Sequence, residues 1–167
     1  MKRFVLSMAV LASIGLAPGA ASAADTLMEK FFVGRTTAVG SFSAINGVNR
    51  KFDVVLTGRL RGNTLTLRED FVYDDGEKDR KTWRFVRTGP TTYSGTRKDV
   101  IGTTTLRVSG NTARFNYLVD LDPGPKKNVV RFYDRMVLSD DGRTIANSAT
   151  VWKYILPVAR VKVDFKR

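Results

Sequence analysis

The sequence predicts an all-β protein in which one antiparallel meander of roughly ten strands closes into a small β-barrel. From Gly34 onward, apolar residues alternate with polar residues at a period of two, which is the period of a β-strand. Turn signals that contain Gly recur at short intervals, among them "INGVN", "RGN", "DDGE", "SGN" and "DDGR". Closure is expected because an open meander would leave two long unpaired edges. A two-sheet sandwich is the alternative architecture.

The first segment is expected to lie outside this domain. Residues 1–23 join a basic start, "MKR", to the apolar run "FVLSMAVLASIGLA" and end with small residues at "ASA". This is the pattern of a cleaved secretory signal, because the run is shorter than the ~20 apolar residues of a spanning helix. Residues 24–167 then form one mature domain, which we expect to be exported, periplasmic and soluble. No Cys is available for a lipid anchor.

The mature chain is expected to begin with a short helical turn, because Leu27 and Phe31 are four residues apart. A Gly-Asn turn at 62–63, a strong hairpin signal, then closes the first long hairpin. It pairs Leu56 with Glu69, and one face of the hairpin becomes almost wholly apolar. The other face carries Lys51, Arg59, Arg61, Arg68 and Asp70.

The acidic stretch "DFVYDDGEKDRK" is predicted to be the tip of the next hairpin. A three-residue loop at 74–76 ends in a left-handed Gly and pairs Glu69 with Lys81 and Asp70 with Arg80. A calcium loop would need oxygen ligands where Val and Tyr stand. The acids at the tip are therefore assigned to turn formation.

The remaining hairpins continue the same apolar face. A loop at 88–90 predicts Phe85 opposite Tyr93 and Trp83 opposite Gly95. Turns at 110–111 and 141–142 predict two further pairs, Val108 with Ala113 and Met136 with Asn147. In the last strand, "VARVKVDFK", apolar and charged residues alternate strictly.

Several polar side chains nevertheless fall on the inward, apolar side of the strands. A charge on a buried face costs several kcal/mol unless it is paired or hydrated. Two explanations stay open: a self-neutralising network that fixes the strand register, or a cavity in which these groups orient the polar head of a ligand. A catalytic pair, Glu69 and Asp134, is a third possibility, but no spacing argues for it. The inward polar set is Glu69, Lys81, Asp99, Asp134, Asn147 and Lys153.

Composition argues against most catalytic classes. The chain has no Cys and no His, and so lacks thiol nucleophiles, the commonest general base and the commonest transition-metal ligand. The formal charge of +12 becomes 12 − 2 = +10 when cleavage removes Lys2 and Arg3. In an exported protein this excess favours envelope lipids or anionic polymers over nucleic acid, or serves solubility alone. We expect no enzyme activity, no cofactor and no metal.

Three long blocks, "LREDFVYDDGEKDRKTW", "YSGTRKDVIGTTTLRVSGNTARFNY" and "VVRFYDRMVLSDDGRTIANSATVWKY", resemble the bacterial family named domain of unknown function 3833. The resemblance runs from Phe31 to Lys166 and implies one intact domain, but no activity. Many relatives look like lipoproteins with a Cys after the signal, which this chain lacks. Arg97 stands where the family usually has a small residue, so it is left out of the inward polar set. Lys81 stands where the family has a basic residue.

The expected function is binding or carriage of an amphipathic, lipid-like and anionic ligand in a barrel similar in plan to lipocalins and fatty-acid-binding proteins. Lys81 and Lys153 would meet the acidic head. The alternative is a non-catalytic envelope structural or interaction protein, with a barrel filled by side chains and a basic outer face that includes Arg59, Arg61, Arg84, Arg131, Arg160 and Lys162. The apolar lining of the ligand site is predicted to be Leu56, Leu67, Phe71, Trp83, Phe85, Tyr93, Phe115, Tyr117 and Phe132.

Overall fold

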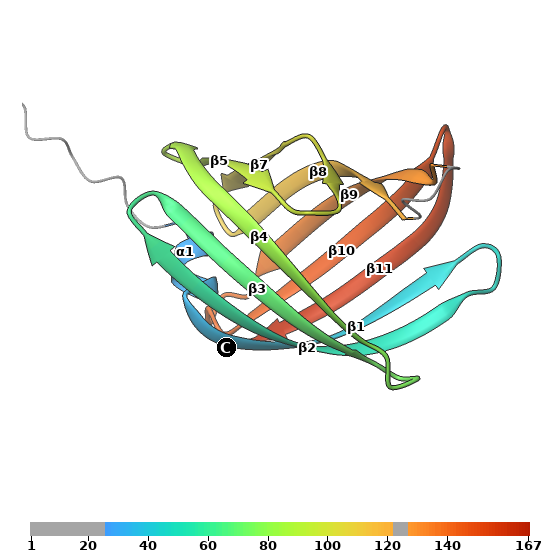
Figure 1. The fold of residues 1–167 in the computed structure, drawn as a ribbon. Coiled ribbons are helices and arrows are strands. Elements are labelled where there is room, and N and C mark those ends of the chain that lie inside the picture. The colour runs from blue at the N-terminus through green and yellow to red at the C-terminus, as the bar shows by residue number, and fades with distance from the viewer. Residues whose placement is uncertain (1–25, 122–126) are drawn as a thin grey trace, which may run out of the picture.

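Within residues 26–121 and 127–167, which this computed structural model describes, the chain forms one short helix and eleven antiparallel strands (Figure 1). The expected signal at 1–23 lies outside the described residues. The elements are α1 (Leu27–Phe32), β1 (Gly34–Ala44), β2 (Asn49–Arg61), β3 (Thr64–Tyr73), β4 (Lys78–Gly89), β5 (Thr92–Thr96), β6 (Val100–Ile101), β7 (Thr104–Ser109), β8 (Thr112–Asp120), β9 (Val129–Leu138), β10 (Thr144–Lys153) and β11 (Leu156–Lys166).

The sheet closes on itself as the sequence predicts. Its order is β6-β8-β7-β5-β4-β3-β2-β1-β11-β10-β9, and β9 pairs in turn with β8. The two-residue strand β6 pairs with the part of β8 that β7 does not reach. The ring among the described residues therefore has ten strand positions, and the barrel of roughly ten strands is confirmed.

The predicted registers of the first two long hairpins are confirmed. Leu56 lies opposite Glu69, Glu69 opposite Lys81, and Asp70 opposite Arg80. Asp70 and Arg80 form the expected outward ion pair across β3 and β4. The pairs Val108–Ala113 and Met136–Asn147 are also found.

One predicted register is wrong by two residues. Phe85 lies opposite Gly95, and Arg87 lies opposite Tyr93, with an irregularity between Arg87 and Gly89. A Cβ atom at Gly95 would lie 2.7 Å from the Phe85 ring, so the ring fits there only because residue 95 has no side chain. A slip of two residues leaves every side chain on its predicted face.

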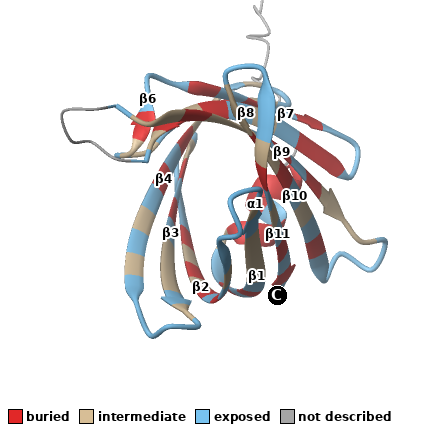
Figure 2. Ribbon diagram, turned by 90° about the vertical axis from the view of Figure 1, so that its right-hand side faces the viewer, coloured by how far each residue is buried: buried red, intermediate tan, exposed pale blue. Residues whose placement is uncertain are grey.

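Helix α1 closes one end of the barrel, and Figure 2 shows it within the ring of strands. Thr26 and Glu29 form a capping box, while Met28, Phe31 and Phe32 are buried. A Cβ atom at Gly58 would lie 1.7 Å from the Phe32 carbonyl oxygen, so glycine is what lets the helix end rest on β2. No helix of the described residues has the length and apolarity to cross a bilayer.

The two ends of the barrel differ in their connections (Figure 1). The turns β2–β3, β4–β5, β7–β8 and β9–β10 lie at the end that α1 closes. The turns β1–β2, β3–β4 and β10–β11 lie at the opposite end, which we call the mouth.

Candidate functional site

The barrel encloses a cavity of about 460 Å³. It extends from Met28 and Phe32 beneath α1 to Val48 and Leu121 at the mouth. Its walls are mainly apolar, since the inward residues of most strands are aromatic or aliphatic. Seven of the predicted apolar lining residues contribute to it: Leu67, Phe71, Trp83, Phe85, Phe115, Tyr117 and Phe132.

Aromatic rings form one continuous wall of the cavity. Trp83 stacks on Phe85 with ring centroids 5.1 Å apart, and meets the Tyr117 ring edge-on at 5.0 Å. Tyr117 in turn stacks on Phe132 at 5.3 Å with nearly parallel planes. This wall offers a flat apolar molecule a large contact surface.

Two predicted lining residues, Leu56 and Tyr93, and one predicted polar residue, Lys153, do not line the cavity, and these predictions are corrected. Leu56 has no exposed surface and belongs to the packed core. Tyr93 turns its hydroxyl away from the cavity toward Glu29. Lys153 does not line the cavity, because it sits at the end of β10 and its Nζ donates a hydrogen bond to Asn128 Oδ1 at 2.8 Å.

The other five predicted polar residues all line the cavity, and Arg97 joins them. Arg97 holds Asp99 with two hydrogen bonds, Nε to Oδ1 at 2.6 Å and Nη2 to Oδ2 at 3.1 Å. Its guanidinium lies 4.6 Å from the centroid of the Trp83 ring. Leaving Arg97 out of the inward set was therefore wrong. Its inward parity with Gly95 was the signal in the sequence.

Lys81 does not pair with Glu69 directly, although the two face each other across β3 and β4. Its Nζ lies 2.8 Å from Asp79 Oδ2 and 3.4 Å from Asp99 Oδ2. Asp99 thus forms ion pairs with both Lys81 and Arg97. The cations of the cavity are largely neutralised by carboxylates of the barrel itself.

Glu69 lies on the cavity wall inside the barrel. No hydrogen bond to its carboxyl is found among the described residues. Its residual exposed surface faces the cavity, since the residue lines it. Burial raises the pKa of the Glu69 carboxyl to about 7, against the opposing effect of the Arg97 and Lys81 charges. Near neutral pH this carboxyl is therefore protonated in part of the molecules.

Asp134 and Asn147 form a second polar pair on the cavity wall. Asn147 Nδ2 donates to Asp134 Oδ1 at 2.8 Å. Burial raises the pKa of the Asp134 carboxyl to about 6, although Asn147 and the Tyr117 hydroxyl both favour its ionised form. No hydrogen bond of ordinary geometry within the described residues reaches Asp134 Oδ2 or Asn147 Oδ1, and both atoms are buried. Asn147 Oδ1 therefore lacks a donor, and Asp134 has only the Tyr117 hydroxyl as a second one, outside ordinary hydrogen-bond geometry.

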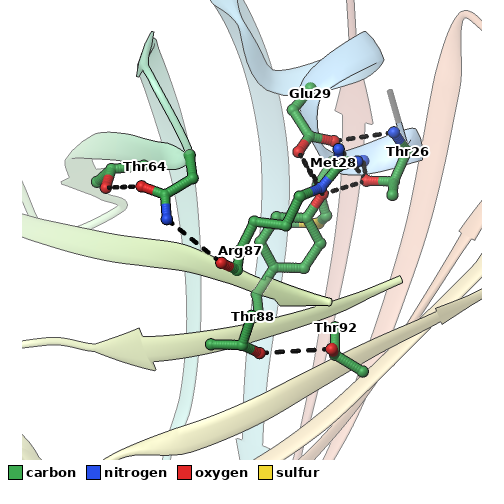
Figure 3. A network of polar contacts seen from close by, with 9 residues as sticks. Thr26, Met28, Glu29, Thr64, Arg87, Thr88 and Thr92 are labelled. Atoms are coloured by element: carbon green, nitrogen blue, oxygen red, sulfur yellow. Dashed lines mark hydrogen bonds and ion pairs between the residues drawn. The ribbon is translucent and has the colours of Figure 1, made fainter. Parts of the chain in front are cut away.

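The closed end contains a polar network of the opposite kind (Figure 3). The Thr26 backbone N–H donates to Glu29 Oε2 at 2.9 Å, and the Tyr93 hydroxyl donates to Glu29 Oε1. Arg87 Nε lies 3.3 Å from the Tyr93 hydroxyl and 3.4 Å from Glu29 Oε1. Burial favours the neutral form of Glu29, but the hydrogen bonds from Thr26 and Tyr93 outweigh it and hold its pKa below the usual value.

The acidic tip of the β3–β4 hairpin forms ion pairs with Arg50 of the neighbouring strand β2. Arg50 Nη2 lies 2.7 Å from Asp75 Oδ2 and 2.7 Å from Glu77 Oε2, and its guanidinium covers the Tyr73 ring at 3.8 Å. Arg50 and Tyr73 also line the cavity, which the sequence reasoning missed. The parity of Arg50 with Phe52 was the available signal. Among residues 26–121 and 127–167, no group of three metal-ligating side chains comes together.

Two of the solved structures that match this chain show the same fold. The S-type phycobiliprotein lyase CPES from Guillardia theta superimposes with a TM-score of 0.59 at 8% identity, over 83% of this chain and 89% of that one. Rv2717c from M. tuberculosis gives a TM-score of 0.59 at 15% identity, over 92% of this chain and 99% of that one. At these identities the likeness establishes the fold alone.

Sequence comparison gives two further results. A search of curated proteins found no significant match. The profile of a family described as "Protein of unknown function (DUF3833)" matches residues 6–167, nearly the whole chain.

Proposed function

The chain belongs to the DUF3833 family, whose description assigns no activity, and we propose that it is a binding or carrier protein for an amphipathic small molecule. One observation carries the proposal: an apolar cavity of about 460 Å³ that contains a few convergent polar groups. Ligand sites in proteins usually have volumes of about 300–1,000 Å³ and this mixture of walls. The apolar part of the ligand would lie against the aromatic wall, and its polar part beside Asp134 and Asn147.

The unpaired acceptors specify the polar end of the ligand further. An anionic head was expected from Lys81 and Lys153, but Lys153 lies outside the cavity, and Lys81 already has two carboxylate neighbours. Asn147 Oδ1 needs a hydrogen-bond donor, and Asp134 has only the Tyr117 hydroxyl beside its bond from Asn147. We therefore propose a head that carries at least one N–H or O–H group. An anionic group on the same ligand would be directed to Lys81.

The rival function, an interaction protein with a barrel filled by side chains, has less support because the cavity has room for a ligand. Its basic outer face is nevertheless present, and we keep an anionic lipid or polymer of the envelope as a second partner of the protein. The predicted residues on this face are exposed, except that Arg131 is half-buried: Arg59, Arg61, Arg84, Arg160 and Lys162.

The proposal places the protein in the periplasm after removal of residues 1–23. Support comes from the sequence pattern of that segment alone. Intact mass of protein recovered from a periplasmic fraction tests it. We expect a chain that begins at Ala24, and a chain that retains Met1 in the cytoplasmic fraction would contradict it.

Native mass spectrometry tests the binding function directly. Protein exported to a bacterial periplasm and purified without detergent should carry a discrete added mass that dissolves into organic solvent. Val161→Trp, which places a large ring in the cavity, should abolish the added mass. Val72→Trp, on the outer wall of β3, is the matched control and should retain it. If none of the three proteins carried an added mass, and none took up lipids offered afterwards, the proposal would be contradicted.

The same experiment addresses catalysis. Raised pKa values, as at Glu69 and Asp134, are also found in general acids. If the extracted molecule changed chemically during incubation with the wild-type protein but not with Glu69→Gln, an enzyme would replace the carrier as the proposed function.

A further inference from the structure

The mouth of the barrel carries exposed apolar side chains that its fold does not require. Tyr154 is 92% exposed and Ile155 is 84% exposed, at the tip of the β10–β11 hairpin. Ile45 is 76% exposed in the neighbouring β1–β2 turn. In Figure 1 these two hairpins reach furthest from α1. We call this group the mouth rim and define it as Ile45, Val48, Leu121, Tyr154, Ile155 and Leu156.

Backbone hydrogen bonds join the parts of the mouth rim. The Ile45 N–H donates to the Val158 carbonyl at 2.9 Å, which ties the β1–β2 turn to β11. The Leu121 N–H donates to the Asn128 carbonyl at 3.0 Å. Asn128 also accepts a hydrogen bond from Lys153 at the base of the β10–β11 hairpin. The exposed side chains thus lie on connected segments at one edge of the mouth.

Tyr154 shows that this edge is not an ordinary hairpin tip. Its φ is +55°, and among the described residues no other non-glycine residue has a positive φ. Two-residue hairpin turns that need a positive φ normally use Gly, Asn or Asp. A bulky aromatic side chain in this conformation is strained, and such strain concentrates at functional sites. Tyr154 at this position therefore makes the turn less stable than Gly, Asn or Asp would.

The mouth rim is continuous with the cavity. Val48 and Leu121 are partly exposed at the mouth and also line the cavity wall. Whatever covers the rim therefore covers the edge of the cavity entrance. A partner seated there would receive or deliver a ligand without passing it through water.

The charges around the rim indicate the kind of partner. The two segments that form most of it, residues 42–52 and 147–161, contain Arg50, Lys51, Lys153 and Arg160 and no Asp or Glu. Aliphatic and Tyr side chains flanked by Lys and Arg match the interface of an anionic bilayer, where the apolar groups insert and the cations meet phosphates. The acidic tip of β3–β4 lies beside β2 and neutralises Arg50 through Asp75 and Glu77, so the cations left for phosphates are Lys51, Lys153 and Arg160.

We propose that the mouth rim docks the protein on an anionic lipid bilayer, with Tyr154 and Ile155 inserted between headgroups. The inference deepens the second partner proposed above, an anionic envelope lipid, by naming the surface that meets it. It does not depend on the ligand site, since docking requires the rim and not an occupied cavity.

Flotation with vesicles of phosphatidylcholine and phosphatidylglycerol tests this proposal. Wild-type protein should float with these vesicles, float less in high salt, and stay behind with pure phosphatidylcholine. Tyr154→Gly combined with Ile155→Ser should weaken the partition coefficient by at least about tenfold, because both inserting side chains are lost. Tyr133→Ser, which removes an exposed ring from the outer wall of β9, should not weaken it.

The double variant is chosen so that misfolding cannot explain the loss. Gly followed by Ser suits a turn with a positive φ at its first residue, so its melting temperature should equal or exceed that of the wild type. Val161→Trp, which places a large ring in the cavity, should still float, and this separates docking from ligand binding. The proposal is overturned if wild-type protein does not float, or if the double variant floats as well as the wild type. Rescue of flotation only by an added envelope protein would overturn it as well.

Discussion

Glu29 and Glu69 are two glutamates enclosed by the same barrel, and burial affects their carboxyl groups in opposite ways. Glu29, beneath α1, accepts hydrogen bonds from Thr26 and Tyr93, and its pKa is lowered. Glu69, on the cavity wall, has charged neighbours but no hydrogen bond found to its carboxyl, and its pKa is raised to about 7. Hydrogen bonds to the ionised form make this difference.

The two glutamates stand for two kinds of polar groups: those that stabilise the fold and those that are available to a ligand. The network around Glu29 satisfies its own donors and acceptors, so it fixes the helix that closes the barrel. The polar groups of the cavity remain incompletely paired at Asp134 Oδ2 and Asn147 Oδ1. A fold tolerates such groups where another molecule, or water, completes the bonds. We infer that the closed end stabilises the barrel, and that the cavity is where the ligand of the proposed function would bind.

The largest expected effect comes from breaking the satisfied network. Glu29→Ala leaves the Tyr93 hydroxyl and the Thr26 N–H without their acceptor, so the free energy of unfolding should fall by about 3–4 kcal/mol. Urea denaturation followed by far-UV circular dichroism measures this. Glu69→Ala is the matched change in the cavity and should lower it by less than about 1 kcal/mol. Equal losses for the two variants would remove the distinction between the two regions.

Trp83→Ala should lower the free energy of unfolding by about 3 kcal/mol, the lower end for a large aromatic truncation. The side chain is 4% exposed and stacks on Phe85, but one side of it already borders the cavity. The same denaturation experiment measures the change. A loss of about 5 kcal/mol would indicate that the barrel is packed around Trp83 on every side, and a loss below about 1 kcal/mol would argue against its core position.

The pH dependence of stability should have opposite signs at the two glutamates. Because the pKa of Glu69 rises from 4.5 to about 7 on folding, its contribution to stability is full below pH 4.5 and is lost as the pH rises through about 7. Glu69→Gln should therefore be more stable than the wild type at about pH 8, by about 1–2 kcal/mol, since cavity hydration weakens the full effect. At about pH 5 the two proteins should be equally stable.

Glu29→Gln is the control for this pH series. The pKa of Glu29 is lowered on folding, so its stabilisation is present above the usual carboxyl pKa and is lost as the pH falls. The variant should be less stable than the wild type at neutral pH, and the difference should shrink in acid. Thermal melts across the pH range measure both variants. Parallel profiles would contradict the opposite pKa shifts.

The smallest expected effect is that of Lys81→Met. Arg97 still holds Asp99 in this variant, and Glu69 can respond by taking up a proton. The free energy of unfolding should change by less than about 1 kcal/mol. A much larger loss would show that Lys81 neutralises Glu69 and that the polar groups of the cavity are a structural network after all.

The sequence contained most of the fold because strand parity and turn chemistry are local signals. The turns at 62–63 and 74–76 determined which residues of the first hairpins face inward, and the inward position of Glu69 followed from this. The inward position of Asp134 followed from its parity with Phe132 and Met136. The turn near residue 90 was misplaced, because its register depends on the Phe85 ring packing over Gly95, a contact between strands.

The residues of the site were harder to predict, because they depend on which partners the ends of the side chains contact. Parity places Tyr93 inside the barrel, but only the position of α1 shows that its hydroxyl is used by Glu29. Parity also placed Arg97 inside, yet its contact with Trp83 and Asp99 is visible only in three dimensions. The strained conformation of Tyr154 has no signal in the alternation of strands.

A fluorescence titration with N-phenyl-1-naphthylamine tests the central claim, that the cavity binds an amphipathic molecule, most directly. This probe is apolar and neutral and has one N–H donor, as the aromatic wall and the unpaired acceptors require. We expect saturable binding to one site in the wild type and in Val72→Trp, and at least much weaker binding in Val161→Trp, which places a large ring in the cavity. Binding of equal strength to all three proteins, or to none of them, would contradict the account.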